Sequence, residues 1–157
     1  MSYLTVQALT LDRVAEAFPI ASLGVSGLTP ELWQNFASLR IRQSEPFEGG
    51  ILTARDGRDS IIGLASYLSK ANLDCAPGLL VDHIIAIAIF ERQRRQALQA
   101  LLDAVYGVAR EHCCSSVDIH LQSRSAAEAD REFLGLLRRT GHRETGVTLT
   151  KALRIGT

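Results

Sequence analysis

The sequence contains little of what several classes of protein require. It has three cysteines in 157 residues, Cys75 and the adjacent pair Cys113 and Cys114, which form neither a disulfide framework nor a metal-ligand spacing. Its longest apolar run, Ile84 to Phe90, is far shorter than the roughly 20 residues of a membrane-spanning helix. We therefore expect a cytoplasmic protein without a membrane segment.

Net charge is also lacking. The 17 Lys and Arg residues balance the 17 Asp and Glu residues, and Lys70 and Lys151 are the only lysines. A neutral chain with 6% aromatic residues gives no electrostatic reason to bind nucleic acid or a membrane surface. The length suffices for one substantial core, and no linker or repeat marks a boundary, so we expect a single domain over residues 1–157.

The first third of the chain predicts one strand and two helices. Leu4–Ala8 fits a strand, and the helix that follows begins at Thr10 and is interrupted at Pro19. The second helix begins more clearly, because Thr29 is a good N-cap and Pro30 suits the first helical position. The apolar spacing of this second helix predicts an inner face made of Leu32, Phe36 and Leu39.

The middle of the chain predicts three strands. Ile51–Ala54 and Ile61–Ser69 are rich in β-formers, and the Asp56-Gly57 pair between them indicates a hairpin. Leu80–Phe90 fits a long strand, in which Ile85, Ile87 and Ile89 alternate with the equally apolar Ile84, Ala86 and Ala88. A strand of this kind is covered on both faces, so we expect it to be central in the sheet.

The last third continues the alternation of helices and strands. We expect a helix from Arg95 to His112, a strand at Val117–Gln122, a helix with a Ser125–Glu128 capping box, and a final strand at Gly146–Leu153. Strands that alternate with helices imply parallel pairing, whereas the hairpin is antiparallel. The elements together predict an α/β fold with a mixed sheet.

Two stretches of the sequence carry a family resemblance. FERQRRQALQALLDAV, Phe90–Val105, is similar to a central strand that leads through a pyrophosphate loop into a helix. FLGLLRRTGHRETGVTLTKAL, Phe133–Leu153, is similar to a closing helix, turn and strand. Both resemble the GNAT superfamily of acyl-CoA-dependent N-acyltransferases, and with the element order the resemblance covers essentially the whole chain. It implies a mixed, mostly antiparallel sheet with a parallel central pair, flanked by helices.

The resemblance also implies a function. It predicts transfer of an acyl group, such as acetyl from acetyl-CoA, to a small-molecule or peptide amine, by a protein that is in many relatives a homodimer. The alternative is a non-catalytic module of the same fold that binds CoA, another anion or a protein partner. The sequence leaves both possibilities open.

The expected pyrophosphate loop departs from the family pattern. Alignment at ALLDAV places Gln93 on the first motif position, but Gln96 and Leu98 stand where the family has glycines. Arg94 and Arg95 are charged donors for phosphate, and they fit a solvated helix start equally well. The resemblance assigns acyl-CoA binding to the following residues: Ala88, Ile89, Phe90, Gln93, Arg94, Arg95, Gln96, Ala97 and Leu98.

Candidate catalytic residues lie near the start of the predicted central strand. A transferase of this class needs a general base to deprotonate the attacking ammonium, and Asp82 and His83 are the titratable groups in place. Both also fit purely structural roles. The tyrosine that often protonates the leaving thiolate in the family is matched by Leu137, so that acid is absent.

Overall fold

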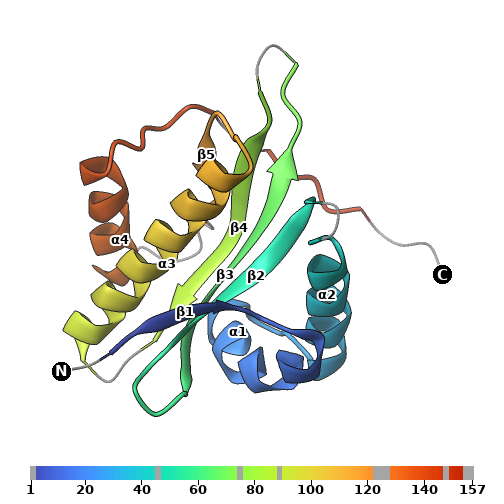
Figure 1. Cartoon of the computed structure of the whole chain (residues 1–157), viewed down its shortest axis with the longest axis vertical. Helices are drawn as coiled ribbons and strands as arrows, with labels where there is room; N and C mark the ends of the chain where they lie inside the picture. Colours follow the sequence, from blue (N-terminus) through green and yellow to red (C-terminus); the bar gives the residue numbers. More distant parts are fainter. Residues whose placement is uncertain are drawn as a thin grey trace. The chain divides into compact units, whose positions relative to one another are not determined.

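The structure is a computed structural model that describes residues 3–44, 47–73, 76–87, 90–121, 128–146 and 149–153. The chain divides into two compact units, Met1–Gln122 and Ser123–Thr157. The first unit contains a five-stranded sheet with helices on both faces (Figure 1). Among the described residues, no helix is long and apolar enough to cross a membrane.

The sheet follows the order of the chain. Its strands are β1 (Thr5–Ala8), β2 (Gly49–Arg55), β3 (Ile61–Lys70), β4 (Gly78–Ala86) and β5 (Val117–Ile119). The pairs from β1 to β4 are antiparallel, and β4 pairs with β5 in parallel. The expected mixed, mostly antiparallel α/β sheet is therefore confirmed, and β4 has a neighbour on each side. Within the described residues, the parallel pair stands at the end of the order.

The final strand expected at Gly146–Leu153 is not formed in the described part of that segment. Gly146 and residues 149–153 are in no strand, and 147–148 lie outside the described residues. Leu149 and Leu153 are 91% and 78% exposed. A buried apolar face is what specifies the pairing of a strand in a sheet. The leucines of this alternating pattern are exposed, so the segment has no such face.

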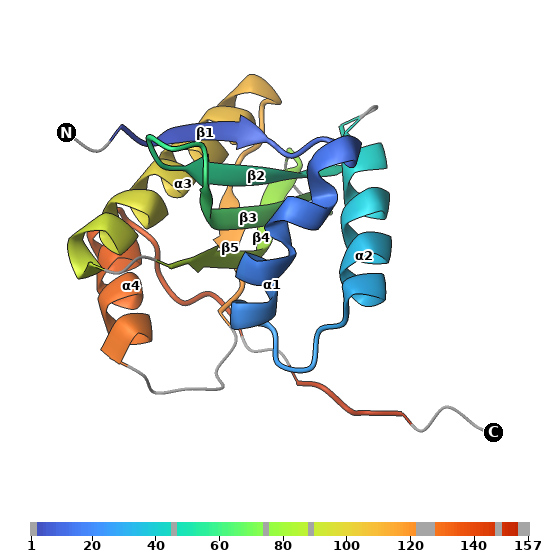
Figure 2. The same cartoon turned by 90° about the horizontal axis from the view of Figure 1, so that it is seen from below.

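The helices cover the two faces of the sheet separately. In the first unit they are the 3₁₀ helix η1 (Leu11–Ala17), α1 (Phe18–Gly24), α2 (Pro30–Arg42) and α3 (Glu91–Glu111). Figure 2 shows α1 and α2 on one face and α3 on the other. Pro19 does not interrupt a helix as expected but lies in the first turn of α1, where its missing N–H is not needed.

The second unit contains one described helix, α4 (Glu128–Arg139). Phe133 and Leu137 on it are buried. The helix is followed by Gly141 at φ +96, a left-handed residue of the kind that ends helices and that we expected there. The expected cap residue Ser125 lies outside the described residues.

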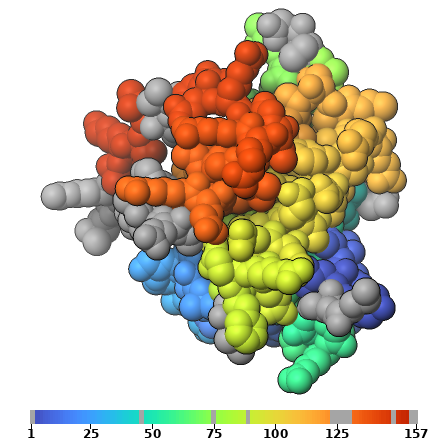
Figure 3. All heavy atoms as spheres, turned by 90° about the vertical axis from the view of Figure 1, so that its left-hand side faces the viewer, coloured from blue at the N-terminus to red at the C-terminus, as the bar shows by residue number. Residues whose placement is uncertain are grey.

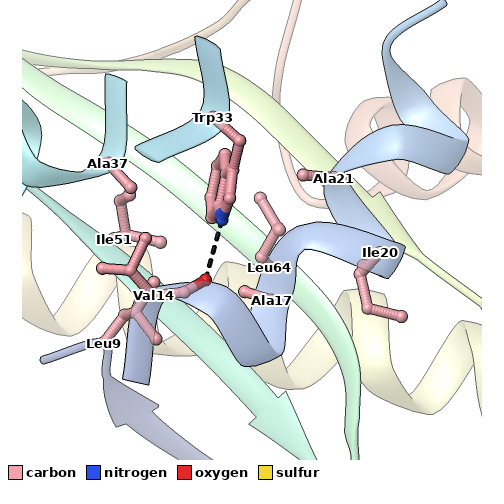
Figure 4. Close-up of a cluster of buried hydrophobic side chains, with 9 residues drawn as sticks. All are labelled: Leu9, Val14, Ala17, Ile20, Ala21, Trp33, Ala37, Ile51 and Leu64. Atoms are coloured by element: carbon pink, nitrogen blue, oxygen red, sulfur yellow. Dashed lines mark hydrogen bonds between the residues drawn. The ribbon is translucent and has the colours of Figure 1, made fainter. Parts of the chain in front are cut away.

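The face of α2 that enters the core differs from the expected one. Trp33 and Ala37 are 4% and 0% exposed, whereas Leu32 and Leu39 are 57% and 61% exposed. The reason is that the indole Nε1 of Trp33 donates to the carbonyl of Val14 at 2.7 Å, which places the largest side chain of the helix in the core with its polar atom satisfied (Figure 4). The core cluster comprises Leu9, Val14, Ala17, Ile20, Ala21, Trp33, Ala37, Ile51 and Leu64.

The start of α2 agrees with the prediction from the sequence. Thr29 has an extended backbone, and its hydroxyl accepts a hydrogen bond from the N–H of Leu32 at 3.2 Å. Pro30 takes the first helical position. Both expected features are confirmed. They depend on local backbone chemistry, so the change in the face that the helix buries does not affect them.

Gly24, at the end of α1, touches β4 closely. A Cβ at this position would overlap Ile85 Cδ1 and lie 2.5 Å from Ile85 Cγ1. Because isoleucine is stiff at its first side-chain torsion, we expect Gly24→Ala to lower the free energy of unfolding by about 1–3 kcal/mol in urea denaturation. Gly107→Ala is the matched control: nothing lies within 4 Å of a Cβ there, so better helix propensity should raise stability by up to about 1 kcal/mol. Equal stability of the two variants would contradict the close contact.

Candidate active site

A β-bulge in β4 turns Asp82 and His83 toward the same helix. Ser66 pairs with His83 and Tyr67 pairs with Val81, so Asp82 is an extra residue without a partner on β3. Successive side chains of a regular strand point to opposite faces of a sheet, and a bulge re-aims them. Both side chains consequently contact α2.

Arg40 of α2 binds the carboxylate of Asp82 with both terminal nitrogens. The distances are 3.1 Å from Nη1 to Oδ1 and 3.1 Å from Nη2 to Oδ2. Nη1 also donates to Ser66 Oγ at 3.0 Å and to the carbonyl of Tyr67 at 3.1 Å. The two charged side chains are only 12% and 20% exposed. This is the geometry in which an arginine and a carboxylate interact most strongly.

The environment holds Asp82 in its ionised form. Burial acts to raise the pKa of the carboxyl, but hydrogen bonding from His83, Arg40 and Ser66 and the charge of Arg40 outweigh burial and lower the pKa to about 2. The Arg40 pair is the contribution that the distances support best, because His83 Nδ1 lies 3.4 Å from Asp82 Oδ2 without hydrogen-bond geometry. A carboxylate with so low a pKa is a weak base. It is suited to holding neighbouring groups in place.

His83 lies between this ion pair and the ring of Phe36. The two rings meet edge to face, with centroids 5.7 Å apart at 82°. Phe36 also lies under the guanidinium of Arg40, whose Cζ is 4.9 Å from the ring centroid. The Nδ1 atom of His83 is buried beside Asp82, while the side chain as a whole is 28% exposed. When Nδ1 carries the proton, Nε2 is free to accept another from a substrate.

The strand leads almost directly into α3, which begins earlier than expected. Phe90 is its N-cap, and Glu91 is its first residue, four positions before the predicted start at Arg95. Gln93–Leu98, which the resemblance matches to a pyrophosphate loop, are therefore helical throughout. The physical reason is that the segment lacks glycine and consists of arginine, glutamine, alanine and leucine, which are all good helix formers.

Of the side chains predicted to bind acyl-CoA, some are buried by this helix and others are exposed. Ala97 and Leu98 are 0% and 3% exposed and belong to the face of α3 that packs on the sheet. Arg95 and Gln96 are exposed, Gln93 is partly buried, and the ring of Phe90 is 71% exposed. The first turns of α3 are the yellow-green surface in Figure 3.

Arg94 has a role within the fold. Its Nε donates to the carbonyl of Ala86 at 3.3 Å, and Nη1 lies 3.3 Å from Glu91 Oε1. It thus links the end of β4 to the start of α3. Ala88 and Ile89, predicted to contact the pantetheine arm, lie outside the described residues.

Sequence reasoning missed Arg40, Phe36 and Ser66 as members of the site. Phe36 was expected in the core, which it partly contacts, and its contact with His83 was not foreseen. Arg40 gave no signal beyond its position in a helix. The bulge could not be predicted either. Asp82 and His83 interrupt an apolar run, and this sequence pattern would be the same in a regular strand and in a bulged one. Only long-range pairing of β3 with β4 reveals the cluster.

In the described ranges, no three His, Cys, Asp or Glu side chains are grouped closely enough to hold a metal ion. Leu137, the residue at the family's tyrosine position, is 3% exposed and apolar. It cannot supply a proton.

Comparison with known proteins identifies the fold. Neither a protein-family model nor a curated protein matches the sequence. The aminoglycoside N-acetyltransferase AAC(6′)-Iy, solved in complex with CoA, matches with a TM-score of 0.80 at 12% identity over 99% of this chain and 97% of its own. The aminoglycoside 6′-N-acetyltransferase AAC(6′)-Ih from Acinetobacter baumannii gives 0.75 at 12% identity, over 98% and 100%. The chain has the GNAT fold.

A third GNAT structure extends the range of chemistry among the neighbours. The ribosomal-protein-alanine N-acetyltransferase from Brucella melitensis biovar Abortus 2308 matches with a TM-score of 0.69 at 14% identity, over 98% of this chain and 99% of its own. The fold expected from the resemblance of Phe90–Val105 and Phe133–Leu153 is confirmed. Identities at this level establish a shared GNAT fold, so the activity must be argued from the residues of this chain.

Proposed function

We propose that the protein is an acyl-CoA-dependent N-acyltransferase that transfers an acyl group, such as acetyl, to an amine. The observation that carries this proposal is the arrangement along one strand: β4 presents His83 beside an ion pair and then leads into the basic start of α3. A proton acceptor and an anion-binding helix start are the two functions that transfer from an acyl-CoA to an amine requires.

The start of α3 suits the pyrophosphate of an acyl-CoA. The first N–H groups of a helix have no partner within it and carry partial positive charge. Arg92 and Arg95 are exposed on the same turns and add full charges. Gln93 and Gln96 supply neutral donors beside them. The acyl-CoA itself supplies an acyl thioester activated for attack.

His83 would act as the general base. A primary amine has a pKa near 10 and is almost wholly protonated at neutral pH, so it must lose a proton before its lone pair can attack the thioester. His83 Nε2 accepts that proton, and the nearby charge of Asp82, 3.4 Å from Nδ1, stabilises the imidazolium that forms. Arg40 keeps Asp82 in place and prevents the carboxylate from taking the proton itself. Solvent would protonate the departing thiolate, since Leu137 does not.

Binding of CoA tests the first half of the proposal. We expect the Arg92→Ala/Arg95→Ala double variant to bind CoA roughly 10- to 100-fold more weakly in calorimetric titration, with a smaller difference at high salt. Arg58→Ala, which removes an exposed arginine from the loop between β2 and β3, is the control and should bind normally. An unchanged affinity of the double variant would show that these arginines do not contact the phosphates.

One observation favours a second function, a module that binds CoA without turnover. The segment that is a glycine-containing loop in the family pattern is helical here, and Leu137 replaces the usual acid. The decisive experiment offers acetyl-CoA and a broad panel of amines and follows release of free thiol. Binding without thiol release above the spontaneous rate would replace the transferase with the module.

A further inference from the structure

Gly49, the first residue of β2, lies against the side chain of Arg40. A Cβ at this position would stand 2.7 Å from Arg40 Cδ and 2.9 Å from the carbonyl oxygen of Tyr67. Carbon atoms that are not bonded to each other prefer separations of about 3.5–4.0 Å. A residue with a side chain therefore does not fit here while Arg40 keeps its place.

The backbone of Gly49 gives no other reason for a glycine. Its φ lies outside the left-handed region, and the residue pairs with Leu68 of β3 as part of the regular ladder. Any L-residue can adopt such an extended conformation. Glycine within a strand often marks a position that another group approaches closely, and the side chain that uses the space here is Arg40.

Arg40 cannot give up this space without losing Asp82. Its guanidinium is held by four hydrogen bonds of 3.0–3.1 Å, one to Ser66, one to the carbonyl of Tyr67 and two to Asp82. The Cδ atom lies between this anchored end and the backbone of α2, so an atom that presses on Cδ moves the guanidinium. A displacement of about 1 Å would break these bonds.

Few charged groups surround His83, which lies beside this pair. The titratable side chains on the neighbouring elements are Glu31, Arg40 and Arg42 on α2, Tyr67 and Lys70 on β3, Asp82 on β4, and Asp118 and His120 on and just after β5; α1 has none. Among the described residues, the carboxylate close to the imidazole is that of Asp82, 3.4 Å from Nδ1. Arg40 is the cation bound to that carboxylate.

Arg40 offsets part of the charge that Asp82 places beside the imidazole. An unpaired carboxylate at this distance favours the protonated ring, and a protonated ring cannot accept a proton from an amine. The guanidinium that binds both carboxylate oxygens weakens this effect. The base is then available at a lower pH than it would be beside a free carboxylate.

We propose that Gly49 is a positioning residue of the transferase: by leaving room for Arg40 to bind Asp82, it extends acyl transfer to lower pH. This proposal rests on the proposed acyltransferase function, because it takes His83 as the general base. Gly49 acts through Arg40 and Asp82 and takes no part in the proton transfer itself.

The first experiment measures kcat/KM of Gly49→Ala against pH, with acetyl-CoA and the amine of the panel that the wild type acylates fastest. We expect the acidic limb of the profile to move up by about 1 pH unit, because a neighbouring carboxylate without its partner favours the protonated imidazole. The rate at pH 6 should then fall roughly tenfold, while the rate at pH 9 changes little. An equal loss at every pH would refute the positioning role.

Gly50→Ala is the matched control on the same strand. A Cβ there would lie 2.5 Å from Tyr67 Oη and 2.8 Å from Cζ. Successive residues of a strand face opposite sides of the sheet, so this change disturbs β2 on the side away from Arg40. The acidic limb should stay where it is in the wild type. The same displacement in Gly50→Ala would show that general damage to β2 causes it.

A double variant keeps the proposal testable if Gly49→Ala does not fold. Arg40→Ala removes Cδ, so the added methyl group would then meet only the carbonyl of Tyr67. We expect Gly49→Ala to lower the midpoint of urea unfolding far less in the Arg40→Ala background than in the wild type, and the double variant to fold. An equal loss in both backgrounds would assign the glycine to the contact with Tyr67 and exclude Arg40 as its reason.

Titration of the Asp82 carboxyl by NMR separates failure of the positioning role from failure of the transferase. The pKa of this carboxyl is lowered to about 2, so its signal should stay constant between about pH 4 and 5 in the wild type. In Gly49→Ala the pKa should return toward its usual value of about 3.9, and the signal should change over this interval. If it does so although no amine is acylated, the transferase fails while Gly49 still places Arg40. A constant signal in the variant would overturn the role of Gly49, whatever the activity.

Discussion

Replacing His83 by Gln is expected to lower kcat at neutral pH by roughly 10²- to 10⁴-fold, the usual contribution of a positioned general base. Glutamine keeps a polar side chain of similar reach beside Asp82 but cannot accept a proton. CoA affinity should stay the same, because His83 lies on β4 within the sheet and the expected phosphate site lies at the start of α3. Initial rates of thiol release at saturating amine measure the effect.

The pH dependence of this variant distinguishes a lost base from a disturbed site. As the pH approaches 10, the acceptor amine becomes deprotonated in solution and no longer needs the imidazole. The ratio of wild-type to variant rates should therefore shrink steadily as the pH rises. His120→Gln is the control, since His120 is exposed just after β5 and should be dispensable. A variant that is fully active at pH 7, or equally impaired at every pH, would remove His83 from the role of base.

Replacing Arg40 by Met is expected to lower the free energy of unfolding by about 2–3 kcal/mol. The change leaves the largely buried carboxylate of Asp82 without its partner, and such an unpaired charge costs more than the pair contributes. Methionine preserves contact with Phe36 and is compatible with the helix, so loss of packing is small. Urea denaturation at pH 7 measures the difference.

The loss of stability caused by Arg40→Met should decrease at acidic pH. The pKa of Asp82 is lowered to about 2 in the folded protein, against about 3.9 in an unfolded chain. The stabilisation from the ionised carboxylate is therefore complete above about pH 4 and is lost as the pH falls toward 2. The stability difference between wild type and Arg40→Met should shrink over that interval. The Arg40→Met/Asp82→Asn double variant should be more stable than Arg40→Met at pH 7, and the opposite result would exclude the unpaired charge as the cause.

The sequence predicts those parts of the fold that depend on local chemistry. Thr29 and Pro30 mark the start of α2, and the β-rich runs around Asp56-Gly57 form the β2–β3 hairpin. The two-sided apolar pattern that begins at Leu80 correctly indicates an interior strand, β4. In each case the signal is a backbone preference or a strict period. Such a signal allows one structure only, so tertiary contacts do not have to select among alternatives.

The expectations that were wrong involve a choice between nearly equivalent patterns. On α2, Phe36 packs partly on the core as expected, but Leu32 and Leu39 are exposed and Trp33 and Ala37 are buried in their place. Both sets have helical spacing, and the bond from Trp33 to Val14 decides between them. At the start of α3, helix propensity prevails over the loop that the family pattern implies. The candidate site depends on contacts between α2 and β4, which no pattern within either segment encodes, so its roles remain predictions for the experiments above.

The extra residue in β4 decides which face of the sheet the His83 side chain occupies relative to Val81. In a regular strand, residues two positions apart, such as Val81 and His83, face the same side of the sheet. Here they pair with Tyr67 and Ser66, which are adjacent on β3, so the extra residue places them on opposite sides. A strand that lacks the extra residue keeps both pairings but has no residue in the position of Asp82 to bind Arg40. Sequences aligned to this chain without a gap there will pair residues that face opposite layers of the molecule.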